Sequence, residues 1–180
     1  MKYRSSKIKV KQKAPDFTLL DIDFKPKRLR DLLNQTVVLA FYPGAFTSVC
    51  AKEMCTFRDS LARLNALKAQ VIGISVNDPF TNKAFAEANQ LNFPLLNDYN
   101  REAVKSYDVA LEDFAGLKEY TAAKRSVFII DKQRIISYVW ISENLGIEPN
   151  YMEIERVLER IEWAKSCIEK SAFFLFFHEC

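Results

Sequence analysis

Two cysteines five positions apart, Cys50 and Cys55, are the residues of this sequence best placed to do chemistry. The turn formers Pro43 and Gly44 precede Cys50, and a helical apolar pattern begins at it, so we expect Cys50 in the first turn of a helix, facing inward. The free N–H groups and positive dipole end of a helix stabilise an anion, and thiols placed there ionise below the ordinary value of about 8.5. A reactive thiolate is therefore one interpretation of Cys50, and on position alone a buried structural cysteine is an equally good one.

A strand and a helix are expected to position this thiol. Residues 36–41 are apolar and rich in β-branched side chains, which predicts a buried strand. After Cys50, apolar residues recur at steps of four and three, as they do on one face of a helix: Met54, Phe57, Leu61 and Leu64. The charged residues of the same stretch are expected mostly on its other faces: Lys52, Glu53, Arg58, Asp59 and Arg63.

The pattern Pro43-x-x-x-Thr47-x-x-Cys50 resembles the active-site signature of the peroxiredoxins, thiol peroxidases that reduce hydrogen peroxide and organic hydroperoxides. The spacing of Cys50 and Cys55 is similar to that of the subfamily called bacterioferritin comigratory protein or peroxiredoxin Q. The resemblance extends from residue 14 to about residue 161 and includes Ala14-Pro15-Asp16-Phe17, Phe41-Tyr42-Pro43 and Phe57-Arg58-Asp59. It implies a thioredoxin-like fold and a reaction that needs neither cofactor nor metal.

The resemblance also assigns roles to four residues. It makes Cys50 the peroxidatic cysteine, Thr47 the hydroxyl that contacts peroxide and thiolate, and Pro43 the residue that shields the thiol. Arg125 matches the family's guanidinium, which would stabilise the charge pushed onto the leaving oxygen. Without the resemblance, Arg125 is better interpreted as a surface charge at a strand edge, and Thr47 as a helix cap or turn residue.

Cys55 lies too far along the expected helix to bond with Cys50 in place. A five-residue step puts the two Cα atoms roughly 8 to 9 Å apart, whereas a disulfide needs less than about 7 Å. The resemblance therefore suggests a cycle in which peroxide converts Cys50 to a sulfenic acid, the helix opens, and Cys55 forms an intramolecular disulfide that a thioredoxin- or glutaredoxin-like protein reduces. Alternatively, Cys55 is a packed apolar side chain and Cys167 or Cys180 resolves the sulfenic acid.

The remaining pattern predicts one α/β domain over residues 1–180, with a C-terminal extension from about residue 169. The segment 36–76 indicates a βαβ unit and 126–140 an antiparallel hairpin, so we expect a mixed sheet flanked by helices. Other strands are expected at 17–20, 71–76, 94–96, 126–130 and 135–140, and helices at 80–90, 102–107 and 151–168.

Residues 109–124 show no clear period and are expected to be a long loop bordering the substrate entrance. Their apolar side chains either face the pocket, where they would suit alkyl hydroperoxides, or pack beneath the loop. We prefer the second arrangement for the set: Val109, Leu111, Phe114 and Leu117.

Charge and composition argue against several partners. The 26 basic and 23 acidic residues are intermixed, and the net charge of +3 leaves no basic face of the kind that nucleic acid needs. No hydrophobic leader or spanning segment is apparent, so we expect a cytoplasmic protein whose cysteines do chemistry. The aromatic tail 173–177 is too short to cross a bilayer and is expected to pack on protein, in a monomer or a homodimer.

Three other classes lack residues that they need. A thioredoxin-type reductase uses Cys-x-x-Cys, which differs from the spacing here. A zinc module or a cysteine hydrolase needs histidine near its cysteines, and the single histidine, His178, lies in the tail. The rival that remains is a peroxide sensor or holdase that uses the same thiol.

Overall fold

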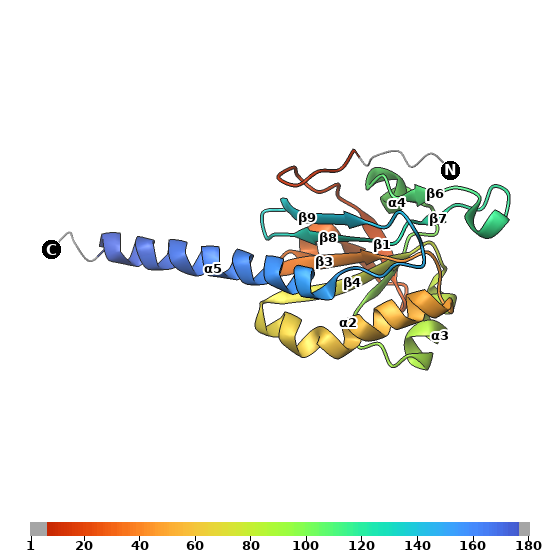
Figure 1. Ribbon diagram of the computed structural model, residues 1–180, viewed down its shortest axis with the longest axis horizontal. Helices are drawn as coiled ribbons and strands as arrows, with labels where there is room; N and C mark the ends of the chain where they lie inside the picture. The colour runs from red at the N-terminus through yellow and green to blue at the C-terminus, as the bar shows by residue number, and fades with distance from the viewer. Residues whose placement is uncertain (1–6, 177–180) are drawn as a thin grey trace.

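The computed structural model describes residues 7–176, with side chains through residue 167. Within this range the central sheet has seven strands in the order β2-β1-β5-β4-β3-β8-β9, with helices on both sides (Figure 1). These strands are β1 (Thr18–Asp21), β2 (Pro26–Arg28), β3 (Thr36–Phe41), β4 (Ala69–Ser75), β5 (Leu95–Asn97), β8 (Ser126–Ile130) and β9 (Ile136–Ile141). The helices are α1 (Leu29–Leu32), α2 (Ser48–Ala66), α3 (Pro79–Ala88), α4 (Glu102–Ser106) and α5 (Tyr151–Phe176).

The centre of the sheet is β3, whose bounds are those predicted for strand 36–41. Its residues are apolar apart from the first, and all six are buried. It pairs in parallel with β4 and antiparallel with β8, so α2 crosses between two parallel strands as predicted. β8 and β9 form the predicted antiparallel hairpin. The mixed α/β sheet expected from the sequence is thus confirmed.

Side chains of β3 alternate between two hydrophobic cores, one on each face of the sheet. The first core also contains residues of α1 and α4. The second contains residues of α2, α3 and α5, among them Cys50, Met54 and Phe57. The apolar stripe predicted for α2 therefore packs α2 against the sheet, and the same packing carries Cys50 inward.

Some short elements are missing from the sequence interpretation. β2, α1, and the paired strands β6 (Ala110–Leu111) and β7 (Ala122–Ala123) were not predicted, and the last two divide the expected loop 109–124. A short 3-10 helix, Phe114–Gly116, lies between them. Val109 and Leu111 are buried, as preferred, whereas Leu117 is 59% exposed. These pieces of two to four residues are too short to show a period in the sequence.

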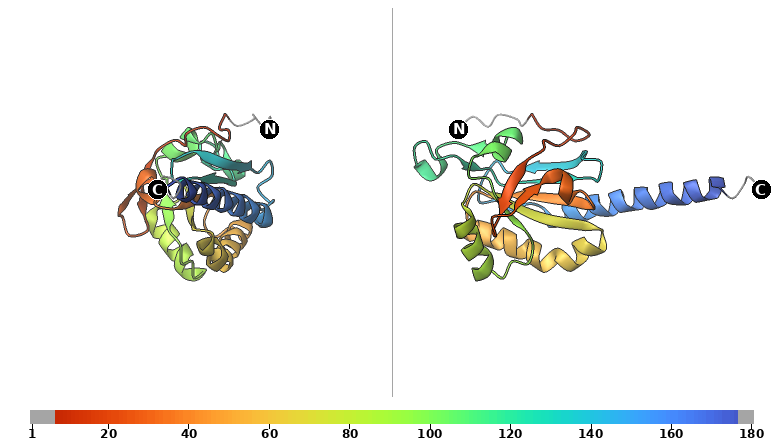
Figure 2. Two further views of the ribbon diagram at one scale, coloured as in Figure 1. Left: turned by 90° about the vertical axis from the view of Figure 1, so that its left-hand side faces the viewer. Right: turned by 180° about the vertical axis from the view of Figure 1, so that it is seen from behind.

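α5 is longer than the predicted helix 151–168 and continues to Phe176. Its first turns pack on the second core through Ile154, Val157 and Leu158, and its C-terminal part runs away from the sheet (Figures 1 and 2). The side chains of the aromatic tail 173–177 and Cys180 lie outside the described residues, so their packing stays a prediction. In the described range, no helix has the length and apolar composition needed to cross a bilayer.

Candidate active site

The thiol of Cys50 lies where β3 passes into α2. Phe46 has a left-handed backbone conformation (φ 63°), which turns the chain so that Thr47 occupies the N-cap of the helix. Cys50 is the third residue of α2 and is 0% exposed. The N–H group of Ala51 makes the first helical bond, to the Thr47 carbonyl at 2.9 Å, so the earlier N–H groups have no acceptor within the helix. The expected position of Cys50, in the first turn and facing inward, is confirmed.

The side chain of Arg125 reaches the Cys50 thiol from the residue before β8, the strand that pairs with β3 on the side opposite β4. β8 runs antiparallel to β3 with Ser126 opposite Phe41, so the residue before β8 lies beside the carboxyl end of β3. Arg125 is 1% exposed, and its Nη2 lies 3.4 Å from the Sγ of Cys50. The alternative of a strand-edge surface charge is therefore wrong, and the chain folds back over a separation of 75 positions to bring the two side chains together.

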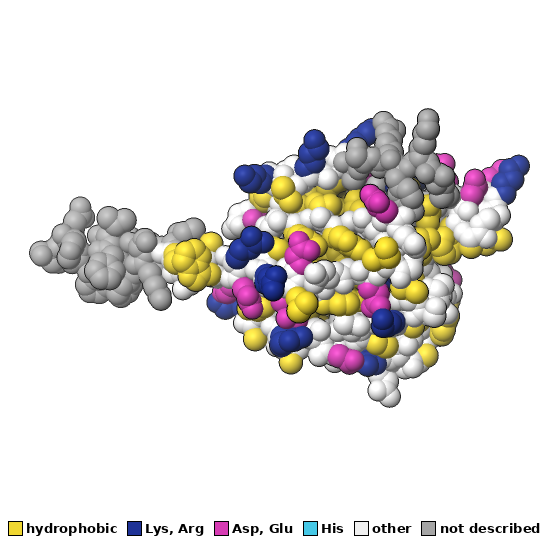
Figure 3. Space-filling model, in the orientation of Figure 1, with side chains coloured by type: hydrophobic (Ala, Val, Ile, Leu, Met, Phe, Trp, Pro, Cys, Tyr) yellow, Lys and Arg dark blue, Asp and Glu magenta, His cyan; other side chains and the backbone are white. Residues whose placement is uncertain are grey.

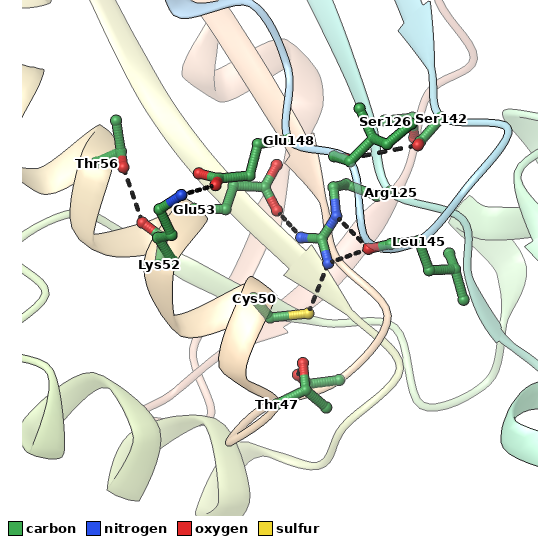
Figure 4. A network of polar contacts seen from close by, with 12 residues as sticks. Thr47, Cys50, Lys52, Glu53, Thr56, Arg125, Ser126, Ser142, Leu145 and Glu148 are labelled. Atoms are coloured by element: carbon green, nitrogen blue, oxygen red, sulfur yellow. Dashed lines mark hydrogen bonds and ion pairs between the residues drawn. The ribbon is translucent and has the colours of Figure 1, made fainter.

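Two further groups fix the guanidinium of Arg125 (Figure 4). Its Nη1 pairs with Glu53, and its Nε and Nη2 both donate to the carbonyl of Leu145, at 3.1 and 3.0 Å. Burial works to lower the pKa of Arg125, but the charge of Glu53 and the hydrogen bonds to Glu53 and Cys50 outweigh it and raise that pKa above its ordinary value. The side chain is therefore a fixed, permanent positive charge facing the thiol.

The burial of Glu53 differs from the prediction made from the sequence. It was expected with the charged residues on the outer faces of the helix, yet it is 0% exposed. Its position three residues after Cys50 puts both side chains on one face of α2, and that spacing was a signal available in the sequence. Burial raises the pKa of Glu53 to about 7, against the opposing charge and hydrogen bond of Arg125.

The thiol and the arginine open onto a pocket of about 230 Å³. Four of the five site residues expected from the sequence line it: Pro43, Thr47, Cys50 and Arg125. The other lining residues are Ser48, Val49, Phe114, Leu145 and Gly146. Pro43 is buried, whereas Thr47 is exposed and its hydroxyl donates to the Gly44 carbonyl at 3.2 Å. The Thr47 side chain makes no cap bond to α2, so its hydroxyl bonds to the preceding turn and not to the helix.

Cys55 does not line this pocket. It is partly buried two turns along α2, and its thiol donates to the amide oxygen of Asn89 at 3.7 Å. Cys50 and Cys55 are both unbridged, and α2 is continuous through both. The expectation that the two thiols do not meet while the helix is intact agrees with this arrangement. Cys167 is exposed on α5, and Cys180 and His178 lie outside the described residues.

The segment between β9 and α5 covers one side of the site. It supplies the Leu145 carbonyl to Arg125, and its Glu148 forms an ion pair with Lys52 of α2 at 2.5 Å (Figure 4). Tyr151 donates to Glu148 at 2.8 Å. Because Leu145 acts through its backbone, no side-chain pattern in the sequence could have indicated it.

Comparison with known families gives a match to the model of the AhpC/TSA family over residues 10–139. The chain belongs to this family, the peroxiredoxins. A relative described as a chloroplastic 2-cysteine peroxiredoxin, from Chattonella marina var. antiqua, is 36% identical over 169 residues, covering 88% of this chain and 83% of the relative. The putative peroxiredoxin bcp of Coxiella burnetii is 36% identical over 133 residues, covering 74% of this chain and 88% of the relative.

Solved structures agree with this assignment. The crystal structure of peroxidoxin BcpB from Mycobacterium tuberculosis matches with a TM-score of 0.76 and 32% identity, covering 86% of this chain and 98% of that one. The peroxiredoxin family and its thioredoxin-like fold, which the motif around Cys50 suggested, are therefore confirmed. As a peroxiredoxin, the protein is a thiol-dependent peroxidase.

Proposed function

We propose that Cys50 is the nucleophile of this peroxidase and that Cys55 resolves its oxidised form. The observation that carries the proposal is the 3.4 Å contact between the Cys50 sulfur and the buried guanidinium of Arg125, made at the start of a helix and at the wall of a pocket. A fixed positive charge and the positive end of α2 both favour sulfur as an anion. The thiolate is the form that attacks an oxygen of peroxide.

The first chemical step transfers one oxygen atom to sulfur. The Cys50 thiolate attacks one peroxide oxygen, the O–O bond breaks, and the other oxygen leaves with the bonding pair and takes a proton to become water or an alcohol. Arg125, the hydroxyl of Thr47 and the free N–H groups of α2 would donate to the oxygen that gains charge. Pro43, buried at the edge of the pocket, would shield the sulfur from bulk water.

The pocket also suggests which peroxides are favoured. Its exposed lining is mainly apolar, and Phe114 from the loop 109–124 contributes to it, in contrast to the preferred arrangement in which that loop's apolar residues all pack beneath. The backbone on both sides of Phe114 is left-handed, at Asp113 (φ 49°) and Ala115 (φ 57°), which holds the short turn that presents the ring. An apolar wall of this kind suits an alkyl or aryl hydroperoxide.

Replacing Phe114 by alanine should therefore change the choice of peroxide. We expect kcat/KM for cumene hydroperoxide to fall about 10-fold relative to that for hydrogen peroxide, since an apolar contact of this size discriminates by about that factor. The matched control is Leu117→Ala, an exposed residue of the same loop that does not line the pocket. Equal loss of activity toward both peroxides would show that Phe114 only supports the loop.

The second half of the proposed cycle removes the oxygen from Cys50. The thiolate of Cys55 attacks the sulfenic sulfur, the S–O bond breaks, and hydroxide leaves and is protonated to water, which leaves a Cys50–Cys55 disulfide. Because both residues lie in one unbroken helix, the first turns of α2 must unwind for this step. A thioredoxin- or glutaredoxin-like dithiol protein would then reduce the disulfide. A cytoplasmic location belongs to the same proposal, because reduced thiols persist there.

Peptide mapping tests the assignment of Cys55. After one equivalent of peroxide and alkylation of the remaining thiols, we expect the disulfide-linked peptide to join Cys50 and Cys55. The Cys55→Ser variant should accumulate a Cys50 sulfenic acid that a sulfenic-acid probe traps. Recovery of Cys50 linked to Cys167 or Cys180 in the wild type would transfer the resolving role to that cysteine.

A further inference from the structure

The end of α3 is joined to the helical turn that carries Cys55. Asn89, the C-cap residue of α3, accepts from the Cys55 thiol through its side-chain oxygen at 3.7 Å. Its side-chain nitrogen donates to the Phe85 carbonyl at 2.9 Å, which fixes the orientation of the amide. The oxygen of Asn89 is thereby aimed at the sulfur by a bond within its own helix.

A second contact joins the same two elements. Arg58 lies three residues after Cys55, on the same side of α2, and its Nη1 donates to the backbone carbonyl of Asn89 at 2.6 Å. Its Nε donates to Asp59 at 2.8 Å, so the guanidinium is held at both ends. The Cys55 turn is therefore tied to α3 at two points, whereas the Cys50 turn is tied to Arg125 and to the segment before α5.

The bond between Cys55 and Asn89 needs the proton on sulfur, because an amide oxygen can only accept. Attack on a sulfenic acid needs the opposite state, a sulfur that has lost its proton and is free to move. Cys55 must therefore leave Asn89 before it can react. Leaving Asn89 and unwinding α2 are then parts of one movement, and the contacts of Asn89 oppose both.

We propose that Asn89 is a positioning residue that holds Cys55 back and so sets how long the Cys50 sulfenic acid survives. This rests on the proposed roles of Cys50 and Cys55. During that lifetime a second peroxide molecule competes with Cys55: the sulfenate attacks it, its O–O bond breaks, and Cys50 becomes a sulfinic acid while the peroxide leaves as water or alcohol. Asn89 thereby controls the division of oxidised Cys50 between disulfide and sulfinic acid.

The test compares wild type with Asn89→Ala under increasing hydrogen peroxide, with disulfide and sulfinic acid measured by mass spectrometry. We expect disulfide formation to be about five-fold faster in Asn89→Ala, the effect of losing one hydrogen bond between uncharged groups. The ratio of sulfinic acid to disulfide should fall by the same factor. The rate at which peroxide first oxidises Cys50 should not change, since Asn89 does not line the pocket. Asn92→Ala, an exposed position three residues on, is the matched control.

A second variant keeps the test decisive if Asn89→Ala does not fold. Arg58→Lys keeps the positive charge near Cys55 but weakens the hydrogen bond to the Asn89 carbonyl. It should also lower the ratio of sulfinic acid to disulfide. An unchanged or increased ratio of sulfinic acid to disulfide in a folded variant would overturn the proposed role of Asn89. It would leave the proposed cycle intact, because the disulfide would still form. A wild type that forms no Cys50–Cys55 disulfide would overturn the proposed cycle, and the inference with it.

Discussion

The Cys50→Ser variant is expected to consume peroxide no faster than the uncatalysed background. A serine hydroxyl stays protonated at neutral pH and has no base beside it, so neither the positive end of α2 nor Arg125 can turn it into a comparable nucleophile. The exchange replaces sulfur by a slightly smaller oxygen in a buried site, and we expect the free energy of unfolding to change by about 1 kcal/mol. Peroxide loss during turnover with several dithiol donors measures the first effect, and urea unfolding measures the second.

Cys167→Ser is the matched control, because Cys167 is exposed on α5 and does not line the pocket. That variant should turn over at the wild-type rate. Substantial turnover by a folded Cys50→Ser would reject Cys50 as the nucleophile. The same assay separates an enzyme from a sensor or holdase: an enzyme reduces many equivalents of peroxide with a suitable dithiol, whereas a sensor stops after one.

Arg125→Lys is expected to slow the oxidation of Cys50 by about 10² to 10³, the usual effect of losing a donor to a developing oxyanion. The guanidinium contacts the thiol, Glu53 and the Leu145 carbonyl at the same time, and a lysine ammonium cannot span all three. Stopped-flow measurement of the second-order rate with hydrogen peroxide reports this loss directly. Alkylation of Cys50 needs no donor to a developing oxyanion, so it should fall less than the reaction of Cys50 with peroxide.

Arg134→Lys provides the comparison for this variant. Arg134 is a partly buried arginine that, like Arg125, forms an ion pair, with Asp16 at 3.3 Å, but it does not line the pocket. Both variants should lose some stability, and only Arg125→Lys should lose the reaction with peroxide. A peroxide rate in Arg125→Lys equal to that of wild type would leave Arg125 with a purely structural role.

The parts of the fold with a clear sequence period could be predicted. The β-branched run 36–41 predicted the strand, because a strand buried on both faces is apolar throughout. The apolar stripe after Cys50 predicted the helix and the position of the thiol, because a helix buried on one side has apolar residues at steps of three and four. Arg125 is different. Nothing near it in the sequence points to Cys50, and only the family resemblance put it in the site, which the antiparallel pairing of β8 with β3 explains.

Other parts depended on contacts that a single sequence does not show. Glu53 is expected on an outer face because it falls outside the apolar stripe of the helix, whereas its burial depends on the distant partner Arg125. The Leu145 carbonyl acts through the backbone, where residue type gives no signal. The prediction of a single domain with an extension from about residue 169 stays a prediction, and α5 passes that residue as one continuous helix. On the face in Figure 3, basic and acidic side chains are interspersed, in keeping with their mixing in the sequence.

The central claim is that the start of α2 and the guanidinium of Arg125 make Cys50 the reactive thiol of this protein. Its most direct test is the rate at which hydrogen peroxide oxidises each cysteine at neutral pH, resolved by mass spectrometry, with N-acetylcysteine as the reference thiol. We predict that Cys50 is oxidised more than about 10²-fold faster than the reference thiol and than the exposed Cys167, because its site supplies donors to the oxygen that leaves. A rate at Cys50 equal to that of the reference thiol would contradict the account.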